Sequence, residues 1–329
     1  MSFKKGDITI HKLPKHFPKT IYGLEKNPLD SSQVQLGRAL FYDPILSLDS
    51  SISCASCHSP YNAFAHTDHK LSHGIYGQIG TRNAPALFNL AWQPSFMWDG
   101  AINHIDMQAL APISHPQEMG ETINNVVYKI SNNKLYKDLF AQTFQDSIIN
   151  SQRILKSIAS FQLSLISANS KYDQVTNGTA SFNEKEKKGL KLFQSHCNSC
   201  HTAPLFSNYT FKNNGLSVDS TLNDLGKMTV TGLNKDKHLF KVPSLRNLSY
   251  TFPYMHDGRF KTLREVLDHY TTIDNNLSVS KELKKPIKLN DNEKTDLISF
   301  LLTLDDKSFV FDPNNKFPKT ILLNSASKK

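Results

Sequence analysis

All four cysteines of the chain fall in two short motifs, each followed directly by a histidine. The motifs are Cys54-Ala-Ser-Cys57-His58 and Cys197-Asn-Ser-Cys200-His201. Two thiols at this spacing can form thioether bonds to one porphyrin while the next histidine ligates its iron. The pattern predicts two covalently bound c-type haems, with His58 and His201 as the proximal iron ligands.

Cysteine pairs at this spacing also have other uses. They could build a zinc site, act as a thioredoxin-like redox pair, or form disulfides, but the first two do not require a histidine after both pairs. Haem is therefore the favoured interpretation. It leaves no cysteine to stabilise the fold through a disulfide, so the haems must supply part of each core.

The elements that precede the motifs suggest an internal duplication. Gln35-Leu-Gly-Arg-Ala-Leu-Phe41 comes before Cys54, and Lys187-Lys-Gly-Leu-Lys-Leu-Phe193 comes before Cys197. Each reads as a helix that leads into a haem motif. The second helix is expected to begin at Ser181-Phe-Asn-Glu184, which has the pattern of a capping box.

The rest of the chain predicts a mainly α protein. Residues 121 to 170 carry apolar side chains at helical spacing, and Asn290-Asp-Asn-Glu293 begins a final amphipathic helix that should pack on the first helix of the second unit. The polar stretch 169 to 178 contains turn formers. We place a domain boundary there, giving cytochrome c domains at 1–172 and 173–329.

Two long stretches, 71 to 120 and 202 to 260, are rich in glycine, proline and asparagine and have weak periodicity. Featureless loops of this length are uncommon in a compact protein, so we expect these stretches to line the haem pockets.

The formal charge of +9 and an ordinary globular composition limit the classes of partner. Lysine-rich stretches at 185 to 191 and 281 to 288 could steer an acidic redox partner or serve solubility alone. No arginine-rich or aromatic-interleaved stripe indicates nucleic acid.

No apolar run is long enough for a transmembrane helix, and Met1–Asp7 lacks the apolar run of an export signal. Because covalent haem attachment normally follows export, we expect a periplasmic protein whose export signal lies outside this sequence.

Beyond the haem motifs, the chain resembles the bacterial dihaem cytochrome c peroxidase and MauG family over nearly its whole length. The matching segments are Leu36-Gly-Arg-Ala-Leu-Phe-Tyr-Asp43, Arg82-Asn-Ala-Pro85, Trp98-Asp-Gly100, Pro116-Gln-Glu-Met119, Val242-Pro-Ser-Leu-Arg-Asn247, Tyr254-Met-His-Asp-Gly258, Thr262-Leu263 and His269-Tyr270. The resemblance implies two cytochrome c domains that face each other. It implies a first haem that meets peroxide and a second haem that passes electrons.

The resemblance also implies roles for three residues. Glu118 matches the family's catalytic acid/base and Gln108 its partner in the first haem pocket, while Trp98 matches a tryptophan between the two haems. A carboxylate there could take a proton from peroxide and return it to the leaving oxygen. Without the resemblance, Glu118 would be a solvated loop residue, Gln108 a helix-surface residue and Trp98, like Trp92, a core aromatic.

A calcium ion between the domains is implied in the same way. The corresponding positions are the Asn83 side chain and the backbone carbonyls of Thr251 and Pro253, with water completing the oxygen shell. Taken alone, Asn83 would be a turn residue.

Two departures from the family pattern bear on function. Many members supply a distal histidine to the first haem, but the aligned residue here is Ile75, with His73 nearby, so we expect an open five-coordinate first haem that needs no reductive switching. The distal ligand of the second haem is expected to be Tyr270, as in MauG, where typical peroxidases have methionine. Met255 and Met228 are rival ligands. An anionic tyrosinate lowers the reduction potential, whereas methionine sulfur raises it.

The expected function is reduction of hydrogen peroxide with electrons from a small cytochrome c or cupredoxin. The alternative is a MauG-like enzyme that oxidises tyrosine or tryptophan of a protein or peptide substrate through a bis-ferryl state, although Ser195 replaces the surface tryptophan that MauG uses. A plain dihaem electron carrier is the third hypothesis. Dimers are common in the resembled family, so a homodimer is one candidate assembly.

Overall fold

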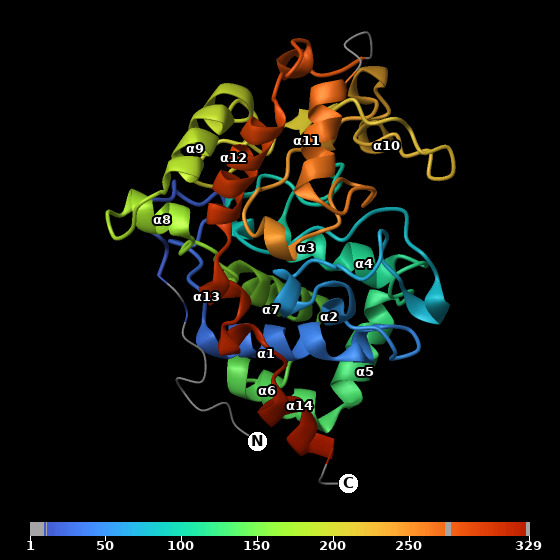
Figure 1. Ribbon diagram of the computed structural model, residues 1–329. Helices are drawn as coiled ribbons and strands as arrows, with labels where there is room; N and C mark the ends of the chain where they lie inside the picture. The colour runs from blue at the N-terminus through green and yellow to red at the C-terminus, as the bar shows by residue number, and fades with distance from the viewer. Residues whose placement is uncertain (1–9, 11, 274–277, 327–329) are drawn as a thin grey trace.

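The computed structural model describes residues 10, 12–273 and 278–326, so Met1–Asp7 lies outside the described residues. Within them the protein is mainly helical, as predicted, with one two-stranded antiparallel sheet, β1 (Phe211–Lys212) and β2 (Phe240–Lys241) (Figure 1). The helices are α1 (Ser31–Tyr42), α2 (Cys54–Cys57), α3 (Ile105–Gln108), α4 (Leu110–Ser114), α5 (Ile123–Asn132), α6 (Lys134–Phe144), α7 (Ser151–Ser164), α8 (Lys171–Thr176), α9 (Glu184–His196), α10 (Met228–Thr231), α11 (Leu263–Thr272), α12 (Asp291–Leu301), α13 (Lys307–Val310) and α14 (Lys319–Ala326).

Two helix pairs form the centres of two units, which agrees with the predicted duplication. Helix α1 packs on α7, and α9 packs on α12 (Figure 1). Each pair crosses at a glycine: a Cβ atom on Gly37 would lie 1.7 Å from the Ser157 carbonyl oxygen, and one on Gly189 would lie 2.0 Å from that of Asp296. Glycine has no side chain at the point where the two helix backbones touch. A larger residue there would force the helices apart.

The capping residues confirm one predicted helix start and correct another. Helix α12 is capped by Asn290, whose side chain accepts from the Glu293 amide while the Glu293 side chain accepts from the Asn290 amide, as predicted. Helix α9 is capped by Asn183 and Glu186, so the predicted box at Ser181 was two residues too early. The error arose because serine and asparagine are equally good caps.

The middle of the chain is helical, as predicted, and supplies much of the first unit's core. Helices α5, α6 and α7 bury Val126, Tyr136, Phe140 and Ile158 against α1. The polar stretch 169 to 178 contains the short helix α8. Of the helices described, none is long and apolar enough to cross a bilayer. The domain boundary stays a prediction.

The last part of the chain, Lys307–Ala326, returns to the first unit and is here called the C-terminal strap (Figure 1). Its Phe309 and Val310 are buried in the same cluster as Phe41. The Tyr42 hydroxyl donates to the Asn315 carbonyl at 2.5 Å. Helix α12 is therefore not the final helix, contrary to the sequence prediction: α13 and α14 follow it because the core of the first unit has a place for their apolar residues.

Candidate functional site

Each histidine of the two motifs is held by backbone carbonyls through its Nδ1 atom. His58 Nδ1 lies 2.8 Å from the Phe64 carbonyl oxygen, and His201 Nδ1 lies 3.2 Å from those of Phe206 and Pro243. Donation from Nδ1 leaves Nε2 as the free acceptor, the atom that a metal needs. Burial lowers the pKa of both histidines to about 4. Both imidazoles are therefore neutral, as iron ligands must be.

The four thiols are unlike those of a redox pair or a zinc site. Burial raises the pKa of Cys54 and of Cys197 to about 12. Reactive cysteines need the thiolate, which requires the opposite shift. Among the described residues, no three His, Cys, Asp or Glu side chains converge as a metal site of that kind would require. The environment suits thiols that become thioethers on a porphyrin.

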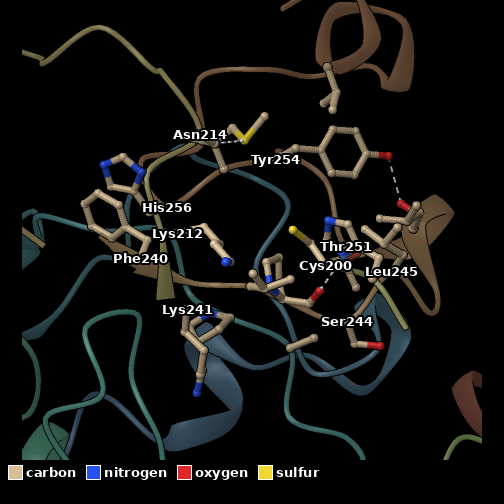
Figure 2. Close-up of a pocket in the computed structure, with 18 of the residues that line it drawn as sticks. Cys200, Lys212, Asn214, Phe240, Lys241, Ser244, Leu245, Thr251, Tyr254 and His256 are labelled. Carbon is tan, nitrogen blue, oxygen red and sulfur yellow. Dashed lines mark hydrogen bonds between the residues drawn. The ribbon is translucent and has the colours of Figure 1, made fainter. Parts of the chain in front are cut away.

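A cavity of about 290 Å³ lies beside the second motif and reaches into the first unit (Figure 2). Figure 2 shows Cys200, Leu245 and Thr251 on one side and Asn214, Phe240 and His256 on the other. Most of the lining comes from the two stretches predicted to form pockets, and it includes Met97, Trp98, Gln108, His201, Pro243 and Tyr270. Its apolar walls suit a flat macrocycle.

Glu118 lies beside the first cysteine pair, close enough to act electrostatically on Cys54 and Cys57. Burial raises the pKa of this carboxyl above its usual 4.5, and the charge of His115 opposes the shift. Its carbonyl accepts from the Ile75 amide at 2.8 Å. The structure thus holds a carboxyl that is protonated more readily than a surface glutamate, close to where the first porphyrin would attach.

Ile75 lies in a loop whose backbone bonds to that of Glu118. Ile75 is buried, and a Cβ atom on Gly120 would lie 2.4 Å from its Cδ1 atom. His73 instead stacks its ring on His69, with 4.2 Å between ring centroids. Its carbonyl oxygen faces the Cys57 sulfur at 3.4 Å. The nearby histidine is therefore engaged elsewhere.

Gln108 and Trp98 both line the cavity. Gln108 is buried at the end of α3, and its Oε1 atom accepts from Gln162 Nε2 of α7 at 2.9 Å. The Trp98 indole nitrogen donates to the Asn83 carbonyl at 2.9 Å. Trp92 lies outside the cavity lining, and its indole donates to the Pro18 carbonyl at 2.7 Å. It has the environment of a core residue, as expected.

Tyr270 lies on α11 in the wall of the cavity. Burial raises the pKa of its hydroxyl to about 12, and a hydrogen bond with the Asn214 side chain opposes that shift. The cysteines of the second motif are near enough to add to it. Asn214 also donates to the Met255 sulfur at 3.4 Å (Figure 2). One amide therefore contacts both rival ligands, while Met228 begins α10 and does not line the cavity.

Asn83, Thr251 and Pro253, the three predicted calcium positions, all line the cavity. Asn83 Nδ2 donates to the Pro253 carbonyl at 2.6 Å. Its Oδ1 atom is buried and has no hydrogen-bond partner. A buried, unpartnered amide oxygen beside backbone carbonyls fits a hard cation such as Ca²⁺.

A second internal repeat, which the sequence analysis missed, lines this cavity. Segments 82–102 and 240–260 run in step: Asn89 and Asn247 both have positive φ, as do Met97 and Met255, and each segment closes with an antiparallel bridge. Identical residues could have revealed it, namely Pro85 with Pro243, Asn89 with Asn247, and the Asp-Gly pairs ending at Gly100 and Gly258.

Comparison with known proteins identifies relatives named as cytochrome c peroxidases or MauG proteins. Residues 31–181 match the family model described as di-haem cytochrome c peroxidase. The chain is 34% identical to the methylamine utilization protein MauG of Methylorubrum extorquens, over 91% of this chain and 85% of that protein. It is 31% identical to cytochrome c551 peroxidase of Nitrosomonas europaea, over 88% and 86%. The crystal structure of a MauG-like protein associated with microbial copper homeostasis superimposes with a TM-score of 0.84 at 30% identity, over 96% and 99% of the two chains.

Proposed function

The chain belongs to the di-haem cytochrome c peroxidase family, and we propose that it reduces hydrogen peroxide to water with electrons from a small redox protein. Glu118 carries the proposal, because peroxide reduction needs a proton-transferring group near the first haem and this buried carboxyl lies beside the first cysteine pair. A carrier would also need two strong ligands at each iron, and Ile75 offers none above the first motif.

The first haem would be held by Cys54, Cys57 and His58. Haem iron, when bound, supplies the centre at which peroxide is reduced. The hydrogen bond from His58 Nδ1 to Phe64 fixes the imidazole plane and directs Nε2 towards the metal position.

The proton transfers belong to Glu118. Its carboxylate accepts a proton from one peroxide oxygen and delivers it to the other, which leaves as water. The whole reaction consumes hydrogen peroxide, two protons and two electrons and yields two waters. Gln108 accepts from Gln162 through Oε1, and its Nε2 atom donates to the Met97 sulfur at 3.9 Å, so the second N–H of Nε2 would be the group that orients the peroxide.

The second haem would be held by Cys197, Cys200 and His201, with Tyr270 as its distal ligand. Electrons from a small cytochrome c or cupredoxin would enter here. Trp98 belongs to the first unit and lines the same cavity as His201 of the second, so we assign the electron route to its ring.

We also propose that Asn83, Thr251 and Pro253 hold a calcium ion. The unpartnered Asn83 Oδ1 atom supports this proposal. Covalent haem attachment would place the protein in the periplasm, where the attachment is normally completed.

A MauG-like task is the second candidate, and Tyr270 is the observation that favours it. An anionic oxygen ligand stabilises the oxidised metal, which suits an enzyme that withdraws electrons from a protein substrate. Ser195 is exposed on α9, so the tryptophan exit used by MauG is missing at that position.

One experiment separates these candidates. The purified holoprotein is mixed with hydrogen peroxide in a stopped-flow instrument, with and without a reduced cytochrome c. Rapid oxidation of the cytochrome supports the peroxidase. Reaction with peroxide, slow cytochrome oxidation and tyrosine modification in an added peptide support the MauG-like task, whereas no reaction supports the electron carrier. Retention of two haem masses by the denatured chain tests covalent attachment.

A further inference from the structure

The two copies of the second repeat contact each other through exchanged hydrogen bonds. The Asn83 amide donates to the His256 carbonyl at 2.7 Å, and the Lys241 amide donates to the Trp98 carbonyl at 2.8 Å. In the aligned repeats Asn83 corresponds to Lys241, and Trp98 corresponds to His256. The two contacts are therefore equivalent, as expected where two similar segments meet around a local twofold axis.

The side chains of Asn83 and Lys241 follow the same relation. Asn83 Nδ2 donates to the Pro253 carbonyl at 2.6 Å, and Lys241 Nζ donates to the Ser95 carbonyl at 2.6 Å. Pro253 and Ser95 are equivalent positions in the repeats. In each unit one side chain thus donates to a backbone carbonyl of the other unit, and the two carbonyls occupy equivalent positions in the repeats.

The remaining calcium position also has an equivalent. Thr251 corresponds to Gln93, whose Oε1 atom accepts from Lys241 Nζ at 3.0 Å. The three residues of the proposed calcium shell, Asn83, Thr251 and Pro253, therefore have positional equivalents across the interface in Lys241, Gln93 and Ser95. The ammonium group lies among oxygens there, and Gln93 contributes its side-chain oxygen where Thr251 would contribute its backbone carbonyl.

We infer that Lys241 is a built-in cation that occupies the twofold equivalent of the calcium site. The inference rests on the calcium part of the proposed function for the identity of the first cation. Its consequence is a domain interface held by two positive charges, one exchangeable and one covalently part of the chain.

Two features of its surroundings act in opposite directions on the charge of Lys241. Burial lowers the pKa of its amine to about 7, while the nearby Asp99 carboxylate opposes the shift. An ammonium that has given up most of its water needs oxygen partners in return. In Figure 2, Lys241 lies at the edge of the cavity with its ammonium directed away from Cys200, so the charge serves the interface and not the cavity interior.

The backbones of Lys241 and Asn83 also hydrogen-bond to Trp98. The Trp98 carbonyl accepts from the Lys241 amide, and its indole donates to the Asn83 carbonyl. The backbone of Asn83 therefore positions the ring proposed to carry electrons between the units, and the backbone of Lys241 positions the Trp98 main chain.

The test exchanges the two side chains and counts calcium. Calcium per chain is measured on holoproteins by equilibrium dialysis followed by elemental analysis, normalised to haem content. Wild type should bind one ion, Lys241→Asn two, Asn83→Lys none, and the double exchange one. Lys212→Asn is the matched control: Lys212 also lines the cavity but pairs with Glu282 at 2.7 Å, so its variant should bind one ion.

The outcomes separate this inference from the calcium proposal. If Lys241→Asn gains an ion while wild type binds none, the equivalence of the sites stands and only the first calcium site is lost. If Lys241→Asn gains no ion, or Asn83→Lys keeps its full complement, the inference is overturned. Because Lys241→Asn could fold poorly, Asn83→Lys gives an independent measurement: its unfolding temperature should no longer fall when a chelator is added.

Discussion

Trp98 is fixed at both its ring and its backbone, because its indole nitrogen donates to the Asn83 carbonyl at 2.9 Å and its carbonyl accepts from the Lys241 amide at 2.8 Å. The ring is thereby bonded to the first unit and the backbone of the same residue to the second. This relationship makes Trp98 the part of the cavity wall whose position depends directly on how the two units meet.

Replacing Trp98 with phenylalanine should slow turnover with a reduced cytochrome by roughly tenfold or more, which corresponds to about 1.4 kcal/mol or more in the barrier. Phenylalanine is harder to oxidise and has no indole donor. Trp92→Phe is the matched control. It also breaks a hydrogen bond to a carbonyl, so it should lower the free energy of unfolding by about 1–3 kcal/mol while turnover is unchanged. Equal effects on turnover would contradict the assignment.

Glu118→Gln should reduce the rate of reaction with peroxide by about 10²–10⁴-fold, the usual contribution of a general acid or base. Stopped-flow absorption of the first haem measures this rate. Glu121→Gln is the control, because Glu121 is a buried glutamate that pairs with Lys129 at 2.6 Å. Its loss should affect stability and leave the peroxide reaction intact.

The peroxide reaction of wild type should weaken as the pH falls. Burial raises the pKa of Glu118, so its carboxyl takes up a proton above the usual 4.5 and can no longer accept one from peroxide. The rate should therefore rise through that raised pKa to a plateau at higher pH. The inflection should vanish in Glu118→Gln, and its persistence there would assign it to another group.

Tyr270→Phe should change the absorption and magnetic spectra of the ferric second haem, because phenylalanine cannot ligate iron. Tyr270→Met should raise the reduction potential of that haem, since a thioether favours the reduced metal. Tyr254→Phe serves as the control: Tyr254 lines the same cavity, but its hydroxyl donates to the Leu248 carbonyl at 2.9 Å. Its variant should keep the wild-type spectrum.

Gly189→Ala should destabilise the second unit by about 1–3 kcal/mol, because the new methyl group would lie 2.0 Å from the Asp296 carbonyl oxygen and must push α9 from α12. Denaturant unfolding checks the stability, and haem content per chain checks whether the second haem is still incorporated. Gly23→Ala should have little effect, since nothing lies within 4 Å of its added methyl group.

The parts of this structure that depend on short-range pattern were predictable. The Cys-x-x-Cys-His spacing and the apolar periodicity before Cys54 and Cys197 identify two similar units, and Asn290 with Glu293 identifies the start of α12. Even there the local signal was ambiguous by two residues at Asn183. Roles for Glu118 and Tyr270 came from family resemblance, because a single carboxylate or phenol has no distinctive spacing.

What escaped prediction depends on contacts between distant residues. The repeat at 82–102 and 240–260 has irregular backbone with positive φ at matching positions, so it has no helical or strand period to detect. The pairing of Lys241 with Ser95 and Gln93 crosses between the two units. The C-terminal strap is equally invisible, because its bonds to Arg38 and Tyr42 join opposite ends of the chain.

The C-terminal strap determines the order in which the two units can complete their folding. The first haem motif leaves the ribosome early, yet the core behind it lacks Phe309 and Val310 until the C-terminal strap has been made and, if the protein is exported, translocated. The second unit, whose helices α9 and α12 are already complete, can close first. Deletion of the C-terminal strap should therefore impair the first haem site, although that site lies far from the strap in the sequence.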